Sequence, residues 1–385
     1  MKVAFIHNDK KLGTGAHFIN DLMASRLREA GVQVKSFYPK NPLLDAPLHL
    51  KGFSNVLFFY SLLEHKDEVL KYDLIQGTTY TPLAFLPFSI PVVSHFGSTS
   101  WGFLKAVPLA KDMEPALRDI WLDMKAGGAI LELNVRSRRP LKDVAEIEKL
   151  VAVRADAVIA TSEIVKKDLL EAGVLPENVY VVPNAIEDYW FKRHPMVLPE
   201  KPSLVFLGRI GADAFTLKLK GLDRLIDYYQ SFSTIEKHTI GITTNKGLVE
   251  WCNTHLQNHH FYANLQKERI PELLSNMAGS ILLITSRYEG FSLSLIEGMS
   301  QGLIPVTYPV GIAPEIIQNG VNGFLVHSQQ EGKKAIEYLL RLTQEQRLQL
   351  AKVSQDTARK FDSKTISKRL IAVYNSTLKK QPART

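Results

Sequence analysis

The segment Glu289-Gly-Phe-Ser-Leu-Ser-Leu-Ile-Glu297 holds two carboxylates with seven residues between them. It follows the apolar run Ser280-Ile-Leu-Leu-Ile-Thr-Ser286, which has the length and the flanks of a buried strand. After the turn the apolar residues recur at helical spacing, and Gly302 follows as a stop signal. The pattern therefore predicts a strand, a turn that carries Glu289, and a helix that carries Glu297 about one turn from its start.

This strand–turn–helix arrangement suits a ligand with phosphate at its centre. The first turn of a helix has unpaired backbone N–H groups and the positive end of the helix dipole, so phosphate binds readily at the amides around Ser292 to Leu295. Gly290 lets the backbone approach a ligand closely. The carboxylates would repel phosphate but suit hydroxyl groups on either side of it, which is the layout of a nucleotide sugar. The alternative is that both are solvated glutamates near a helix end.

A longer stretch around the two glutamates resembles a known family. Ser286 to Val326 is similar to the Glu-x7-Glu donor segment of the retaining glycosyltransferases of family 4, which have the GT-B fold. The resemblance rests on these residues: Ser286, Gly290, Phe291, Gly298, Gly302, Pro305 and Gly311-Ile-Ala-Pro-Glu315. It implies that Glu297 holds the donor's ribose and Glu289 the transferred sugar, with Gly290, Phe291, Ser292 and Leu293 around the diphosphate.

Composition narrows the class of protein. A chain of 385 residues exceeds a usual single core, so two domains are expected. One cysteine excludes an internal disulfide, and no run reaches the ~18 apolar residues of a membrane-spanning helix. The net charge of +8 suits an anionic substrate, and no stripe of arginine with aromatic residues indicates nucleic acid. We expect a cytoplasmic protein, with the inner face of the membrane as a second location to consider.

The first half of the chain reads as a strand, a glycine-containing loop, a helix and a second strand, as in doubly wound α/β folds. In the loop Gly13-Thr-Gly-Ala16, Gly15 is either part of a tight turn or, as the resemblance implies, a contact for donor or acceptor. His95 ends the predicted strand Ile90–His95, at the edge where such sheets bind ligands. The resemblance places a histidine here near the transferred sugar, with a catalytic role for its backbone carbonyl. The structural alternative is an ordinary hydrogen-bonding histidine.

The predicted division of the chain follows the family. Residues 1–186 form an N-terminal, acceptor-side Rossmann-like domain, and 187–202 form a proline-rich linker. Residues 203–360 form the nucleotide-sugar-binding Rossmann-like domain, and the helix in 361–385 crosses back to the first domain. Within 99–148 we expect amphipathic helices whose aromatic residues, Trp101 and Trp121, are exposed. The two domains would face each other across a cleft.

A strand ending in Arg209 and a lysine before the helix Leu222–Tyr229 suit a cationic clamp for diphosphate. The alternative is that they are ordinary cations of a surface loop. The resemblance selects Arg209 and Lys220 as the phosphate-binding pair, although the long loop between them leaves Lys218 as an alternative. It also places the nucleobase next to Asn264. The histidines His259 and His260 have no partners at metal-ligand spacing, so no metal or other cofactor is expected.

The resemblance implies a retaining transfer of sugar from a UDP- or GDP-sugar to an acceptor hydroxyl, in synthesis of glycan, glycolipid or cell-envelope polysaccharide. His95, Glu289, Arg209 and Lys220 are the expected catalytic residues, and a glycan or lipid-linked acceptor and a peripheral membrane contact are the expected further partners. Two alternatives stay open. One is an inactive nucleotide-sugar-binding subunit, and the other is a glycoside phosphorylase or hydrolase. Helical rise puts Cα atoms eight residues apart at ~12 Å, whereas glycosidase carboxyls lie ~5–9.5 Å apart, which argues against the second.

Overall fold

The computed structural model describes residues 1–9, 15–39, 54–192 and 194–380. By their internal contacts they form two compact units. Unit 1 comprises Met1–Trp101, Arg139–Ala185 and Ser363–Thr385, and unit 2 comprises Gly102–Arg138 and Ile186–Asp362. The chain therefore passes between the units four times.

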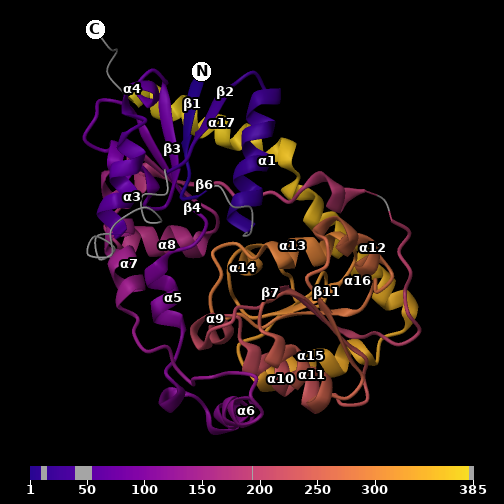
Figure 1. Ribbon diagram of the computed structural model, residues 1–385. Helices are drawn as coiled ribbons and strands as arrows, with labels where there is room; N and C mark the ends of the chain where they lie inside the picture. The colour runs from indigo at the N-terminus through magenta and orange to yellow at the C-terminus, as the bar shows by residue number, and fades with distance from the viewer. Residues whose placement is uncertain (10–14, 40–53, 193, 381–385) are drawn as a thin grey trace. The chain divides into compact units, whose positions relative to one another are not determined.

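Unit 1 is built on a six-stranded, all-parallel sheet with the order β2-β1-β3-β4-β5-β6 (Figure 1). Its strands are β1 (Lys2–Ile6), β2 (Gln33–Phe37), β3 (Leu74–Thr78), β4 (Val92–Phe96), β5 (Ala157–Ala160) and β6 (Val179–Val181). Its helices are α1 (Gly15–Glu29), α3 (Ser54–Leu63), α4 (Lys66–Val69), η2 (Thr81–Phe85), α7 (Arg139–Arg154), α8 (Glu163–Glu171), η4 (Pro176–Asn178) and α17 (Ser363–Lys380). Helix α5 (Ser100–Ala106) contains the first crossing between units. Ser162 is the N-cap of α8, since its side chain accepts a hydrogen bond from the Val165 N–H.

Unit 2 has a second six-stranded parallel sheet, with the order β12-β11-β10-β7-β8-β9. Its strands are β7 (Leu204–Arg209), β8 (Lys237–Ile242), β9 (His259–Ala263), β10 (Ile281–Ile284), β11 (Ile304–Thr307) and β12 (Phe324–Leu325). Its α-helices are α6 (Pro115–Ala126), α9 (Ala214–Leu219), α10 (Leu222–Ser231), α11 (Lys246–His255), α12 (Ile270–Ser275), α13 (Leu293–Ser300), α14 (Ala313–Ile316), α15 (Gln329–Leu340) and α16 (Gln344–Ala358). Short 3-10 turns complete it: η3 (Ala110–Asp112), η5 (Asp188–Phe191), η6 (Lys267–Arg269) and η7 (Arg359–Phe361).

Each sheet has one point where the strand order reverses. In unit 1 it lies between β1 and β3, and in unit 2 between β7 and β10. Open α/β sheets bind ligands outside the carboxyl ends of the strands at such a switch point. In unit 2 the last residue of β7 is Arg209, and the segment Ser286–Glu289 follows β10. The sheet order alone therefore brings Arg209 and this segment together.

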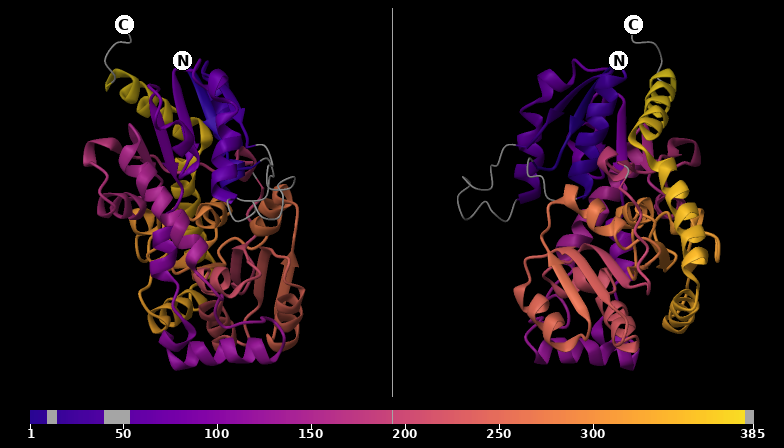
Figure 2. Two further views of the ribbon diagram at one scale, coloured as in Figure 1. Left: turned by 60° about the vertical axis from the view of Figure 1, so that its left-hand side comes forward. Right: turned by 90° about the vertical axis from the view of Figure 1, so that its right-hand side faces the viewer.

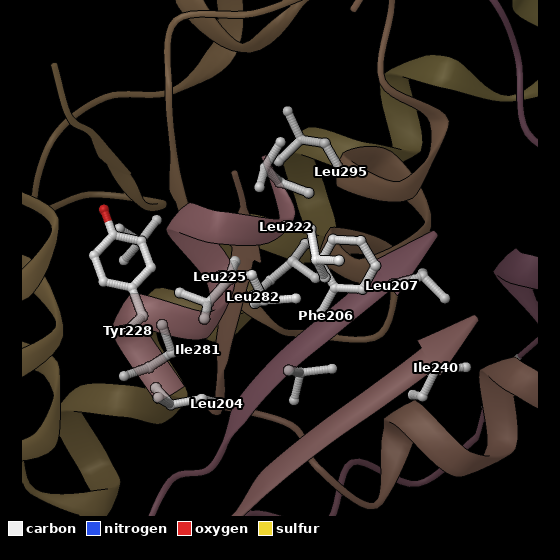
Figure 3. Packing of buried hydrophobic residues seen from close by; sticks show 14 of the residues in the cluster. Leu204, Phe206, Leu207, Leu222, Leu225, Tyr228, Ile240, Ile281, Leu282 and Leu295 are labelled. Carbon is white, nitrogen blue, oxygen red and sulfur yellow. The ribbon is translucent and has the colours of Figure 1, made fainter. Parts of the chain in front are cut away.

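The core of unit 2 lies between its sheet and the helices that cover it. Figure 3 shows Leu204, Phe206, Ile281 and Leu282 of the sheet packed with Leu222 and other apolar side chains of α10 and α13. These strands are buried on both faces, which explains their nearly continuous apolar runs. The core therefore fixes the ends of β7 and β10, where the candidate site begins.

Residues 102–138 differ from the prediction because they pack with unit 2 and not with the N-terminal domain. Helix α6 lies beside α10 (Figure 1), and its Trp121 is fully buried in the same core as Leu204. The expectation of an exposed Trp121 is therefore wrong. The physical reason is that α6 has an apolar face whose partner is α10, more than ninety residues further along the chain.

Two other segments also bear on the predicted division. The predicted linker 187–202 is attached to unit 2, because the Arg347 guanidinium donates to the carbonyls of Pro199 and Glu200 at 2.8 Å each. Helix α17 belongs to unit 1 and packs along α1 (Figure 2), where the Arg26 Nε donates to the Ser363 Oγ at 2.7 Å. Among the described residues, no helix is long and apolar enough to cross a membrane.

Candidate functional site

Two oppositely charged side chains meet at the switch point of unit 2. The Lys220 Nζ lies 2.6 Å from the Glu289 Oε1, which also accepts a hydrogen bond from the Ser286 Oγ at 2.7 Å. Lys220 ends α9, and the following Gly221 has a φ of +65° and packs on the Thr285 carbonyl, where a Cβ would lie 2.0 Å from the oxygen. Only glycine fits there, so this turn is held against the end of β10. Sequence separates the pair by 69 residues, and packing brings it together.

A buried ion pair behind Lys220 and Glu289 holds their two turns together. The Arg287 guanidinium binds the Asp223 carboxylate through two contacts of 2.8 and 2.6 Å, and it also donates to the Lys218 carbonyl at 2.7 Å. Asp223 is fully buried and the Arg287 side chain is 6% exposed. A bidentate pair of this kind fixes geometry as well as charge. The sequence analysis missed both residues, since neither has a local pattern that marks it.

The structure separates the two lysines that the sequence left as alternatives. Lys218 is 1% exposed, and its Nζ donates to the Asn134 Oδ1 at 2.9 Å and to the Pro108 carbonyl at 3.3 Å. Burial lowers the pKa of Lys218 to about 8. Lys218 therefore attaches residues 102–138 to α9, whereas Lys220 lies on the accessible side of the turn beside Glu289.

The start of α13 has an unusual residue, Ser292. Its φ of 75° lies in the left-handed region, which is costly for a non-glycine residue. The side chain is buried, and its Oγ has no hydrogen-bond partner among the described residues. Gly290 and Phe291 before it are also buried, and Leu293 after it is half-buried. Strain together with an unpaired buried hydroxyl at a helix N-terminus is typical of a binding site.

Glu297 lies one turn into α13, as the sequence predicts. It is 7% exposed, and its Oε1 lies 3.2 Å from the Lys267 Nζ. Burial raises the pKa of this carboxyl, an effect that Lys267 opposes. The two glutamates of the motif are thus each held by a lysine of their own, Glu289 by Lys220 and Glu297 by Lys267.

Two further predicted donor residues differ in accessibility. Arg209 ends β7 with an exposed side chain for which the described residues show no ion pair. Asn264 adopts a φ of 57° after β9, and its side chain bonds both backbone groups of Thr243, accepting from the N–H and donating to the carbonyl at 3.0 Å each. Its amide thus holds the loop after β8, so any contact from Asn264 to a base would come from its backbone.

The remaining predicted residues belong to unit 1. His95 lies in β4, its carbonyl accepts from the Thr79 N–H at 3.0 Å, and burial lowers the pKa of its imidazole to about 4. The ring lines a small pocket with Gln76 and Asn184. Gly15 is the first residue of α1, while Gly13 and Thr14 of the same loop lie outside the described residues.

Glu148 is a buried carboxyl near the carboxyl end of the unit 1 sheet that the sequence analysis did not single out. Its Oε2 accepts from the Ser100 N–H at 2.8 Å, at the start of α5. Burial raises the pKa of Glu148 to about 7. In the sequence, Glu148 looks like one more solvated charged residue of a helix, beside Glu146 and Lys149. Nothing in that pattern marks it as buried.

The described residues contain no cluster of three or more His, Cys, Asp or Glu side chains that could hold a metal ion. Side chains and backbone amides of the kind found around Lys220 and Ser292 can stabilise the charge of a bound diphosphate. The arrangement gives no specific support to an acid–base pair of glutamates, since each carboxylate already has an ammonium partner.

Comparison with family models covers both halves of the chain. Residues 15–188 match the model described as Glycosyltransferase Family 4, and residues 197–357 match Glycosyl transferases group 1. This chain belongs to glycosyltransferase family 4. The two parallel sheets and their helices are those of the GT-B fold.

Solved structures of low sequence identity share this fold along nearly the whole chain. Sucrose-phosphate synthase from Thermosynechococcus elongatus has a TM-score of 0.74 at 17% identity, covering 99% of this chain and 100% of that one. HepE of Anabaena, solved with UDP-glucose, has a TM-score of 0.62 at 18% identity, covering 98% and 100%.

Curated relatives match only in part. An alpha-maltose-1-phosphate synthase of Mycobacterium tuberculosis is 24% identical over 204 residues, 47% of this chain and 51% of the relative. An uncharacterized 41.2 kDa protein in the cps region of Klebsiella pneumoniae is 26% identical over 201 residues, 50% and 53%. The match thus spans about half the length of these relatives.

Proposed function

We propose that this glycosyltransferase moves a hexosyl group from a nucleoside diphosphate sugar to an acceptor hydroxyl with retention of configuration at the anomeric carbon. UDP- and GDP-sugars are the proposed donors. A glycan or a lipid-linked sugar is the proposed acceptor, and a peripheral membrane contact is a further proposal that would suit a lipid-linked one. Retention, donor and acceptor are inferences from the family and from the chemistry of the site.

One observation carries the donor proposal. The strained Ser292 turn, with its buried and unpaired hydroxyl, begins a helix between two lysine-held carboxylates. A diphosphate fits the N–H groups of this turn and the Ser292 Oγ, and the carboxylates accept hydrogen bonds from sugar and ribose hydroxyls. The ammonium of Lys220 has three donors, of which one points at Glu289. The others and the Arg209 guanidinium are available to phosphate oxygens.

The proposed chemistry is a front-face substitution. The bond between the anomeric carbon and the leaving phosphate oxygen breaks, and the acceptor oxygen bonds to the same face of the carbon. The acceptor's proton passes to the departing phosphate oxygen. Negative charge grows on the diphosphate as the sugar leaves, and Lys220, Arg209 and the α13 amides stabilise it more strongly in the transition state than in the ground state. The His95 carbonyl is proposed to face the positive charge that develops on the sugar.

Donor consumption measured with and without a panel of sugar acceptors tests this function. A transferase consumes donor faster with the right acceptor, and NMR of the product should show the anomeric configuration of the donor. Equal consumption without acceptor would indicate a hydrolase. Nucleotide binding without any turnover would indicate an inactive binding subunit. Thermal-shift screening against UDP-, GDP- and ADP-sugars selects the donor first, since a ligand that binds the native state raises its apparent stability.

A further inference from the structure

Lys267 holds two buried carboxylates at once. Its Nζ lies 2.6 Å from the Glu187 Oε1 and 3.2 Å from the Glu297 Oε1. The three side chains are 17%, 14% and 9% exposed in the order Lys267, Glu187 and Glu297. Charges this far from water persist only when they are paired and hydrogen-bonded, and Lys267 is the cation that both carboxylates contact.

The three residues come from separate parts of unit 2. Lys267 begins η6 after β9, Glu297 lies in α13, and Glu187 precedes η5, directly after the crossing from unit 1 at residue 186. The η5 turn is fastened to the same place, because the Trp190 Nε1 donates to the Glu187 Oε2 at 3.1 Å and the Gln301 side chain donates to the Trp190 carbonyl at 2.6 Å. Glu187 is thus fixed next to α13 by contacts other than Lys267.

The charges around Glu297 do not balance locally. Two carboxylates face one ammonium, and Lys220 contributes from further away. Tyr189 of η5 also faces the cluster, and burial beside Glu187, Glu297 and Glu268 raises the pKa of its phenol, so it stays neutral. Burial and Glu187 both favour the protonated form of Glu297, while Lys267 and Lys220 favour the carboxylate.

We propose that Lys267 is a positioning residue for the nucleotide: it keeps Glu297 aimed and ionised as a double acceptor for the ribose hydroxyls, against the opposing charge of Glu187. This inference rests on the proposed function, because it takes Glu297 as the ribose ligand. A carboxylate accepts from both ribose hydroxyls, whereas a protonated carboxyl must donate one proton and loses that arrangement. Lys267 itself need not touch the nucleotide.

The test is the pH dependence of nucleoside diphosphate affinity, measured by calorimetry from pH 6 to 9 on the full chain. In Lys267→Met, the carboxylates of Glu187 and Glu297 face each other without the cation that bridges them, so the carboxyl of Glu297 should take up a proton at higher pH than in the wild type. As the pH is lowered, the nucleotide affinity of Lys267→Met should therefore begin to fall at a higher pH than that of the wild type. Each unit of upward shift weakens binding about tenfold at pH values below both midpoints. Titration of the nucleotide's own phosphate is common to all variants and cancels.

Companion variants separate charge from packing. Glu187→Gln in the Lys267→Met background removes the repulsion and should move the midpoint back down. Lys267→Arg keeps the charge and should bind like the wild type. Lys333→Met is the matched control, because Lys333 pairs with Asp227 at 2.9 Å elsewhere in unit 2 and its loss should leave the pH profile unchanged.

The outcomes are distinguishable. If the wild type binds no nucleoside diphosphate at any pH, the proposed function fails. Suppose the wild type binds but the affinity of Lys267→Met falls with the same pH midpoint as that of the wild type. Then only the role of Lys267 is overturned. The same conclusion follows if adding Glu187→Gln to Lys267→Met does not move the midpoint back down. If Lys267→Met does not fold, the single variant Glu187→Gln is the test. In this variant Glu297 is the only carboxylate that Lys267 pairs with, so the pH midpoint of nucleotide affinity must be lower than in the wild type.

Discussion

The strand order reverses at one point in each unit, but the side chains at the strand ends near that point differ in charge between the two units. At the β7–β10 switch of unit 2, basic and acidic side chains are paired: Lys220 with Glu289, and Lys267 with Glu297 a turn into α13. Arg209 adds an exposed cation at the end of β7. This edge has fixed charges of both signs close to a helix N-terminus.

At the corresponding edge of unit 1, burial disfavours the charged forms of two described side chains, His95 and Glu148. Burial lowers the pKa of His95 to about 4, so the imidazole is uncharged, and it raises the pKa of Glu148 to about 7, so that carboxyl keeps much of its proton. The neighbours of Glu148 are the Ser100 N–H and the Thr79 hydroxyl. Hydroxyl, amide and neutral imidazole groups can recognise a sugar without attracting a phosphate.

Under the proposed function, the same architecture, used twice, would serve two kinds of ligand. Fixed charges suit a diphosphate whose charge grows during the reaction, and neutral polar groups suit an uncharged sugar. On this view, a change that removes a charge from unit 2 should affect turnover most. A change that replaces the titrating carboxyl of Glu148 in unit 1 by a neutral group should affect the stability of the protein and the pH dependence of that stability.

The largest expected effect comes from the cations of unit 2. Lys220→Ala and Arg209→Ala should each lower turnover by ~10²–10³-fold, the usual scale for losing one charge-stabilising donor. Lys218→Met is the matched control. Lys218 is buried against residues 102–138, so this variant should lose thermal stability and keep most of its turnover at a temperature where it is folded. Steady-state kinetics beside thermal melts make the comparison.

A chelator gives the counter-test for these cations. If they carry the charge of the leaving group, transfer should survive removal of divalent metal. Activity that disappears with a chelator and returns with magnesium or manganese would contradict the assignment of that role to Lys220 and Arg209.

The two glutamates of the motif should differ in what they bind. Glu297→Ala should weaken a free nucleoside diphosphate and the nucleotide sugar alike, by ~10-fold or more, since it removes a charged acceptor of ribose hydroxyls. Glu289→Ala should spare the free nucleoside diphosphate and reduce turnover. Calorimetry with the nucleotide alone checks the division. Equal losses in both variants would show that the two carboxylates do not have separate roles.

The unit 1 carboxyl predicts a pH effect on stability. The pKa of Glu148 is raised from 4.5 to about 7 in the folded chain. Between these values the unfolded chain loses the proton while the folded chain keeps it, so stability falls as pH rises, by about 3 kcal/mol in all. Glu148→Gln keeps an acceptor for the Ser100 N–H. Because glutamine does not titrate, the stability of this variant should not fall with pH in this way. The stability of the variant relative to the wild type should therefore grow from pH 4.5 to 7 and stay level above, as followed by hydrogen exchange in β4 and α5. A constant difference would refute it.

The sequence predicted the strands and helices around the site because they carry local signals. The runs before Arg209 and Ser286 and the helical spacing after Ser292 each lie within a few residues, and the structure has β7, β10 and α13 there. Strand β11 was missed. It contains Pro305, which argues against a central strand when only the sequence is read.

The remaining features depend on contacts between distant residues. Glu187 and Lys267 are 80 positions apart, and Lys218 and Asn134 are 84 apart. The choice between Lys218 and Lys220 could not be made from spacing, since both precede the same helix. It depends on which side chain the 102–138 segment covers. The strain at Ser292 was also invisible, because serine before a helix reads as an ordinary N-cap.

The smallest expected effect comes from replacing Ser292. The replacement should raise the stability of the free protein and lower its affinity for the nucleoside diphosphate. A residue with φ of 75° strains its backbone by about 1 kcal/mol, which glycine would relieve, and the buried Oγ has no described partner whose loss would offset that gain. Ser292→Gly should therefore raise the melting temperature of the free protein by a few degrees. If the hydroxyl binds a phosphate oxygen, the same variant should bind the nucleoside diphosphate more weakly, by about 5- to 10-fold, as expected for one lost hydrogen bond. Stability and affinity then change in opposite directions, which packing alone would not produce. A stabilised variant with unchanged nucleotide affinity would show that Ser292 is strained for a structural reason and that the helix amides bind the phosphate without it.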